Sequence, residues 1–251
     1  MDAPRTAPLH LDGPLATFTF DDFPASAYDV GGKLVESFGA KATYFVSSQF
    51  HNQTVNGLTY YTTDHLRQVH AMGHEIGCHG ASHVQLGEHG PAFARGSIQR
   101  NKAFMKELFG DHFEMTSFAY PYGDTSMRVK RAAAKEYPLL RGVNHGSNFG
   151  TVDLSQIRVV SLEARHWNED HMKRVIDDAV RYNHWLVYLT HDVSADPTPY
   201  GSTEPMVRIP LELLQAAGIP IKTLRAAAES AIFVKPEATA FEPSMTVPII
   251  G

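Results

Sequence analysis

The chain has 251 residues, 43% of them hydrophobic, and its 22 Lys and Arg against 27 Asp and Glu give a net charge of -5. The basic residues are scattered along the chain and form no cluster, so the sequence gives no indication of a nucleic-acid partner. No apolar run approaches the roughly 18 residues needed to cross a bilayer, so we expect no transmembrane segment. The length suits one barrel-sized α/β domain, and we expect a single domain over residues 1–251 with its core at about 15–225.

The two ends of the chain and its single cysteine bear on location and assembly. The opening residues, MDAPRTAPLHLDGP, contain no apolar segment of a secretory signal. Cys78 has no partner for an internal disulfide bond and suits a reducing compartment. Cytoplasm is therefore the default expectation, with secretion or a periplasmic location as the alternative if a leader has been removed. Residues 234–251 form a Pro-rich tail that could cover another subunit or trail in solvent, so a homo-oligomer stays open.

Strand-like and helix-like segments alternate along most of the chain. Apolar runs rich in β-branched and aromatic residues predict strands, and the amphipathic stretches between them predict helices, several of which are followed by a Gly that suits a helix stop. In chain order we predict strand 15–20, helix 25–38, strand 42–47, helix 62–72, strand 75–79, helix 92–109, strand 117–121, helix 125–136, strands 139–145 and 158–164, helix 168–182, strand 185–191, helix 205–217 and strand 219–224.

Seven or eight such β–α units favour an α/β fold in which parallel strands form a closed or nearly closed (β/α) barrel. An open doubly wound sheet is the alternative, but no G-x-G-x-x-G follows the first strand, which weakens a dinucleotide-binding interpretation. In a barrel the functional side chains lie at the C-terminal ends of the strands, where the βα loops gather.

Polar residues follow several predicted strands at this position. Asp21 and Asp22 stand at the end of the first strand, His79 ends the strand at 75–79, and His83 lies on the turn beyond it. Two imidazoles and one carboxylate make a three-ligand set with open positions, which suits catalytic zinc and also non-haem iron. A metal would neutralise one carboxylate of the pair, while the other stays ionised and free to accept a proton.

The motifs "TFDD", "HGASH", "FAYPYG" and "LTH", in this order and at these intervals, resemble the motif series of the polysaccharide deacetylases, also known as carbohydrate esterase family 4 or the NodB homology domain. The resemblance runs from about residue 15 to 225. It implies a distorted (β/α) barrel, usually of seven strands, that removes N- or O-acetyl groups from sugars with a divalent metal, commonly zinc. Cobalt, nickel, manganese and iron remain alternatives for the metal.

The resemblance also implies roles for individual residues. Asp21 would be the general base, and Asp22, His79 and His83 would hold the metal. His191, in "LTH", would be the general acid that protonates the leaving amine or alkoxide. In "PYG", Pro121 and Tyr122 would border the substrate, and the backbone N–H of Tyr122 would help to hold the oxyanion. A base and an acid on opposite sides of the substrate predict a bell-shaped pH profile.

The chain departs from the family at the third motif, where the family commonly has an Arg that holds the base carboxylate. This position is Ala119 here. Arg158, which begins a later strand-like run, is our replacement hypothesis, because it would form a charge-assisted pair with Asp21 from another part of the rim.

The second and fourth motifs also differ. Gly80 stands where the family usually has Ser or Thr. In the fourth motif Trp167 is the best candidate for the family's Trp, either packed in the core or forming a wall of the site, and Glu163 is a poor candidate for its acid. Leu189 could line an acetyl pocket or belong to the core. We expect Cys78 to face away from the metal, and we leave Tyr60, Tyr61 and Tyr200 out of the site.

The sequence therefore predicts a metal-dependent hydrolase that takes acetyl from carbohydrates, most simply from N-acetylglucosamine-containing glycans or oligosaccharides. One rival is another C–N hydrolase on the same barrel that opens cyclic ureides or amides. A second rival is a catalytically silent carbohydrate-binding protein, against which the retention of Asp21 and His191 argues.

Overall fold

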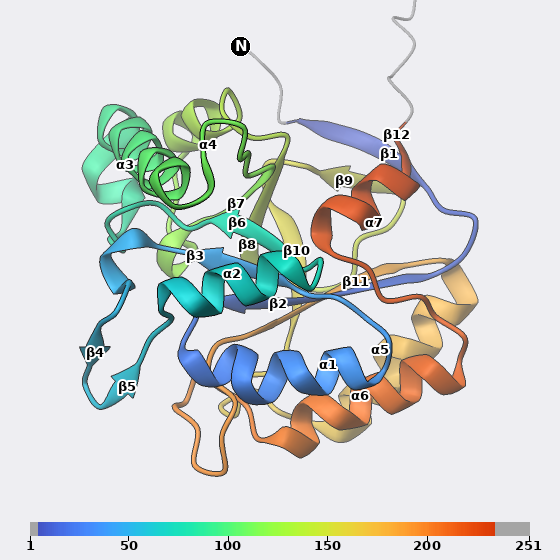
Figure 1. Cartoon of the computed structure of the whole chain (residues 1–251). Coiled ribbons are helices and arrows are strands. Elements are labelled where there is room, and N and C mark those ends of the chain that lie inside the picture. Colours follow the sequence, from blue (N-terminus) through green and yellow to red (C-terminus); the bar gives the residue numbers. More distant parts are fainter. Residues whose placement is uncertain (1–4, 234–251) are drawn as a thin grey trace, which may run out of the picture.

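The computed structural model describes residues 5–233, and over this range seven parallel strands close into a barrel (Figure 1). This confirms the (β/α) barrel class. The order around the barrel is β10-β11-β2-β3-β6-β7-β8. The strands are β2 (Leu15–Asp21), β3 (Thr43–Val46), β6 (Glu75–Cys78), β7 (Ser117–Ala119), β8 (Leu139–His145), β10 (Ile157–Ser161) and β11 (Trp185–Thr190).

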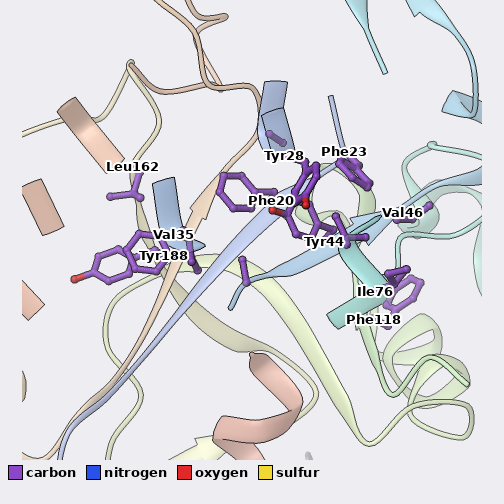
Figure 2. Packing of buried hydrophobic residues seen from close by; sticks show 14 of the residues in the cluster. Phe20, Phe23, Tyr28, Val35, Tyr44, Val46, Ile76, Phe118, Leu162 and Tyr188 are labelled. Atoms are coloured by element: carbon purple, nitrogen blue, oxygen red, sulfur yellow. The ribbon is translucent and has the colours of Figure 1, made fainter. Parts of the chain in front are cut away.

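The first barrel strand, β2, is buried along its whole length. It pairs with β11 on one side and β3 on the other, and both of its faces are covered. Parallel strands of this kind appear in sequence as continuous apolar runs. Figure 2 shows Phe20 and Tyr44 packed together, and their ring centroids lie 5.2 Å apart. Trp185 is also fully buried, and its Nε1 donates to Thr17 Oγ1 at 3.0 Å.

Helices surround the barrel (Figure 1). The predicted helix 25–38 is divided into a π-helical segment, η1 (Ala27–Gly32), and α1. The predicted helix 92–109 begins earlier, and a kink at Gly90, with φ of 79°, interrupts it. The α-helices are α1 (Lys33–Ser37), α2 (Thr63–Ala71), α3 (Leu86–Phe109), α4 (Met127–Ala133), α5 (Glu169–Tyr182), α6 (Glu204–Ala216) and α7 (Leu224–Ser230).

The predicted eighth strand at 219–224 is wrong. Ile221 makes only an isolated parallel bridge to Ala16, with backbone bonds from Ala16 to Pro220 and from Lys222 back to Ala16. Pro220 has no N–H for a strand ladder. The chain then turns into α7, whose start is capped by the Thr223 side chain accepting from the N–H of Ala226. The barrel consequently closes with seven strands.

Short strands outside the barrel were not predicted. β1 (Thr6–His10) pairs antiparallel with β9 (Thr151–Asp153) and with β12 (Ile232–Phe233). A hairpin of β4 (Thr54–Val55) and β5 (Leu58–Thr59) extends beside α2 (Figure 1). Two 3₁₀ turns, η2 (Ser48–Phe50) and η3 (Pro121–Gly123), follow barrel strands. Among residues 5–233 no helix is long and apolar enough to cross a membrane. The predicted tail at 234–251 lies outside the described residues.

Candidate active site

A cavity of about 340 Å³ opens at the C-terminal ends of the barrel strands. It is bordered by residues from the end of β2, from strands β8 and β11, and from the loops after β6, β7, β10 and β11. The residues that line it are Asp21, Asp22, His79, His83, Tyr122, Gly123, Val143, His145, Glu163, Arg165, Leu189, His191 and Tyr200.

Three of these side chains present their ligand atoms to one another. The ligand atoms of Asp22, His79 and His83 all lie within 4.8 Å of each other. Among residues 5–233 this is the one group of three or more His, Cys, Asp or Glu residues that could hold a metal ion. Oδ1 of Asp22 lies 3.3 Å from Nε2 of His79 and 3.0 Å from Nε2 of His83. Asp22 has φ of 63°, a left-handed turn directly after β2. The turn ends the alternation of side chains between the two faces of the strand, so that the carboxylates of Asp21 and Asp22 both reach the cavity.

The donor set fits a divalent cation. His79 Nδ1 donates to the carbonyl of Ala119 at 2.8 Å, so in the neutral ring Nε2 presents its lone pair to Asp22. Oδ1 of Asp22 is buried and accepts no hydrogen bond. Lone pairs that face a buried carboxylate at about 3 Å require a proton or a cation between them. The cluster therefore has the chemistry of a metal site with two imidazoles and one carboxylate.

The charges of this cluster act on one another. Burial by itself raises the pKa of Asp22, but the interactions with His79 and His83 outweigh it and hold the pKa well below the usual range. Burial lowers the pKa of His79, and the carboxylates of Asp22 and Asp21 reverse this effect and raise it above the ordinary value. The carboxylate at the centre of the cluster is thus kept ionised, as a metal ligand must be.

The second carboxylate, Asp21, is held by Arg141 of β8 and not by Arg158. The Arg141 guanidinium donates to Oδ1 of Asp21, and both side chains are buried. Arg158 is exposed, and its Nη1 donates to the carbonyl of His145 at 3.4 Å. The hypothesis for Arg158 is wrong because its position on β10 faces outward between buried Ile157 and Val159.

The replacement for the expected Arg lies on the neighbouring strand. Ala119, where the family commonly has Arg, is the register partner of Arg141 in the pairing of β7 with β8. The guanidinium that holds Asp21 therefore comes from the next strand, β8, at the same level of the barrel. An Arg inside the apolar strand-like run at 139–145 was a signal that sequence reasoning missed.

His191 follows β11 and is 19% exposed at its side chain. Its Nδ1 donates to the carbonyl of Tyr200 at 3.1 Å and lies 3.7 Å from Oε1 of Glu163. Glu163 is 3% exposed. The interpretation of Glu163 as a poor candidate is therefore wrong, because this carboxylate is the acidic neighbour of the His191 imidazole.

The turn after β7 lines another side of the cavity. Tyr122 has φ of 56° and a 63% exposed side chain, whose ring centroid lies 4.4 Å from that of His83. Gly123 has φ of 66°, and a Cβ there would come 2.2 Å from Cγ2 of Val143. Pro121 is buried at the start of this turn and does not border the cavity. The turn thus places Tyr122 and Gly123 at the edge of the cavity.

The remaining candidates divide between the cavity and the core. Leu189 borders the cavity, whereas Trp167 is half-buried and packs against the core, so it is not a wall of the cavity. Cys78 packs in the core, as predicted. Tyr200 borders the cavity although it was left out of the predicted site, and its position depends on a loop that no sequence motif marks. Tyr61 is fully buried and donates to the Ser47 carbonyl.

Comparisons with known proteins agree on the fold. The sequence profile of the family described as polysaccharide deacetylase matches residues 10–139. No curated protein matches the chain. Among solved structures, the Xyl-CE4 domain of a multidomain xylanase from the hindgut metagenome of Trinervitermes trinervoides is similar, with a TM-score of 0.60, 18% identity and coverage of 87% of this chain and 91% of that chain.

Two further structures have the same architecture. A family 4 acetyl xylan esterase from Clostridium thermocellum, in complex with a cobalt ion, has a TM-score of 0.57 at 22% identity and covers 84% of this chain and 89% of its own. A family 4 pseudoenzyme from Bacillus anthracis has a TM-score of 0.58 at 13% identity, with coverage of 88% and 67%. At these identities the likeness establishes a shared fold.

Proposed function

Because this chain belongs to the polysaccharide deacetylase family and is therefore a hydrolase that acts on acetyl groups of carbohydrates, we propose that it is a metal-dependent deacetylase with Asp21 as base and His191 as acid. Its proposed substrates are N-acetylated or O-acetylated glycans, first among them oligosaccharides that contain N-acetylglucosamine. One observation carries the proposal: a carboxylate and an imidazole suited to opposite proton transfers border the same cavity as the three-ligand cluster.

Asp22, His79 and His83 would hold the cation, with zinc as the first expectation and cobalt, nickel, manganese or iron as alternatives. When bound there, a divalent cation supplies Lewis-acid polarisation of the acetyl carbonyl and activation of water. Asp22 brings the negative charge, and Ala119 fixes the ring of His79 through its carbonyl.

Asp21 is arranged to accept a proton from the attacking water. Its Oδ1 is engaged by Arg141, while its Oδ2 lies 4.0 Å from Nε2 of His79 and thus faces the ligand cluster. The guanidinium favours the ionised carboxylate and limits its rotation. We therefore assign the proton transfer to Oδ2 of Asp21.

His191 is arranged to supply a proton to the leaving group. Its Nδ1–H is directed to the Tyr200 carbonyl, so Nε2 is the nitrogen left to donate to the leaving amine or alkoxide. The backbone N–H of Tyr122 would donate to the developing oxyanion, and Leu189 would provide an apolar contact for the acetyl methyl.

Acetate release tests the proposal. The full chain, loaded with zinc, is assayed on a panel of N-acetylated and O-acetylated oligosaccharides, with and without chelator, beside Asp21→Asn. Asn keeps the shape of the side chain but cannot accept the proton, so we expect a loss of at least about 100-fold in kcat. Release that is insensitive to chelator, equal release by the Asn variant, or no release from any substrate would contradict the proposal.

A further inference from the structure

We propose that Arg165 is a positioning residue for His191, and that it acts through Glu163 and Tyr200. This inference rests on the proposed function, in which His191 is the general acid. It concerns the loop after β10 and the loop after β11, which meet at one side of the cavity.

Arg165 engages both oxygens of the Glu163 carboxylate. Its Nη2 donates to Oε2 at 3.0 Å and to Oε1 at 3.3 Å, and its Nε donates to Oε2 at 3.2 Å. Ser161 Oγ donates to the same Oε2 at 3.0 Å. A fork of this kind fixes the carboxylate in orientation as well as in charge. Glu163 is thereby held with Oε1 at 3.7 Å from His191 Nδ1, beyond hydrogen-bond distance.

Arg165 also supports the residue that does bond to His191. Its guanidinium lies over the ring of Tyr200, 4.2 Å from the ring centroid. The two loops are joined by backbone bonds from Ala164 to the carbonyl of Gly201 at 2.7 Å and from Arg165 to the carbonyl of Pro199 at 3.2 Å. Arg165 therefore contacts both groups that face Nδ1 of His191, the Tyr200 segment and the Glu163 carboxylate.

This arrangement determines which acceptor binds the Nδ1–H of His191. A direct bond to an ionised carboxylate would stabilise the imidazolium and make it a weaker acid, whereas a neutral carbonyl partner stabilises it less. The guanidinium offsets the Glu163 charge and adds positive charge near the ring. With Arg165 in place, the imidazole is oriented by Tyr200 and the carboxylate is kept from capturing its proton.

Other charged and titratable groups also face the space around His191. They come from every strand end that borders the cavity, and they are common to the wild type and the variants proposed below. They are Asp21 and Asp22 after β2, His79 and His83 after β6, Tyr122 after β7, His145 of β8, and Tyr200. Asp192, next in the chain, is buried, and its carboxylate accepts from Thr198 N–H at 2.9 Å and from Thr198 Oγ at 2.6 Å.

The test compares Arg165→Ala, Arg165→Lys and the control Arg158→Ala in the zinc-loaded full chain. Arg158 is an exposed Arg on β10 outside the cavity lining, and its guanidinium reaches only the His145 carbonyl among the bonds seen in residues 5–233. For Arg165→Ala we expect kcat to fall about tenfold with KM changed less than about twofold, and the alkaline limb of the pH profile to move up by about one unit. Lys should recover part of both effects, and Arg158→Ala should match the wild type.

The sign of the pH shift follows from the role of an acid. Activity is lost as pH rises through the deprotonation of His191, so stabilising its protonated form moves this loss to higher pH. A fall in activity with an unchanged pH profile would indicate a structural role only, and a large rise in KM would indicate a substrate contact. Either result would overturn the inference.

A readout without substrate separates this inference from the proposed function. In the zinc-loaded chain labelled with ¹³C-histidine, His191→Gln identifies the His191 signals, and their titration is followed in the wild type and in Arg165→Ala. A titration that moves to higher pH in the variant supports the inference even if no acetate is released. Equal titrations overturn it even if deacetylation is confirmed.

Discussion

Arg141 and Asp21 form a buried ion pair between side chains that lie 120 residues apart in the sequence. The Arg141 side chain is fully covered, and the Asp21 side chain is 5% exposed. Arg141 also donates from Nη1 to the carbonyl of Gly142 at 3.1 Å. The barrel thus holds the proposed base by a cation from β8.

Removing the Arg141 guanidinium should destabilise the folded protein as well as inactivate it. Arg141→Met leaves a buried carboxylate without a partner, and we expect the free energy of unfolding to fall by about 3–5 kcal/mol. Chemical denaturation measures this change, with Arg158→Ala as the exposed control. In the double variant Asp21→Asn with Arg141→Met neither member of the pair carries a charge, so most of the stability should return while acetate release does not. A single Arg141→Met variant as stable as wild type would contradict the prediction.

Each of the three cluster residues should be required for metal binding. We expect His83→Ala and Asp22→Asn to weaken zinc affinity by more than about 100-fold, since even changes to groups behind the ligands cost about 10–100-fold. Metal analysis after dialysis and titration calorimetry measure the effect. Zinc at 100 times its dissociation constant should add about 2.7 kcal/mol of stability to the wild type, and a chelator should remove it. His171→Ala, which changes an exposed imidazole, should behave as wild type, and unchanged binding by His83→Ala would refute the assignment.

His74 should make the protein less stable in mild acid. Its Nδ1 accepts the N–H of Ala42 at 2.9 Å, and its Nε2 donates to Glu36 at 2.9 Å, so the ring is neutral. Burial lowers the pKa of His74 below its ordinary 6.5, although Glu36 partly opposes this. Since the folded state binds the proton less readily, the stabilising contribution is present above pH 6.5 and is lost as pH falls.

The loss from His74 should reach at most about 1.4 kcal/mol per pH unit until the folded-state ring is protonated. Denaturant unfolding between pH 7.5 and 5 measures the slope, and His74→Asn should reduce it. His171→Asn, at an exposed position, should keep the wild-type slope. A slope that is the same in all three proteins would show that His74 does not contribute.

The turn at Tyr122 should not tolerate a side chain at Gly123. Both Gly123 and Gly150 have left-handed φ, 66° and 60°, but a Cβ on Gly150 meets nothing within 4 Å, whereas on Gly123 it meets Val143. We expect Gly150→Ala to cost about 1 kcal/mol from backbone strain alone, and Gly123→Ala about 1–3 kcal/mol more from the clash. Only Gly123→Ala should also lower kcat, because the proposed oxyanion donor moves. Equal losses of stability and activity in both variants would show that the turn is not part of the active site.

Much of the candidate site could be predicted because of where its residues fall in the chain. Asp21, Asp22, His79, His83 and His191 all lie at or just after the end of a strand that an apolar run marks. The C-terminal ends of parallel strands meet at one end of a barrel, so order along the chain was enough to place these side chains together. The motif series could be read for the same reason.

The partners of these residues depended on contacts that no local pattern records. Arg141 reaches Asp21 only because β7 and β8 pair in the register that sets it beside Ala119, and a slip of one residue would turn its side chain away. The prediction of an eighth strand at 219–224 was wrong because a local apolar run does not reveal whether a neighbouring strand is available to pair with it.

The sequence by itself therefore determined the barrel, the strand ends and the residue types gathered there, since hydrophobic periodicity and chain order are local properties. Only the tertiary structure decided which cation holds Asp21 and which groups face His191. Glu163, Arg165 and Tyr200 belong to two loops whose shapes follow from bonds between them, such as Ala164 N–H to the carbonyl of Gly201. Bonds between distant segments form only when the barrel has closed, so their geometry cannot be read from either loop alone.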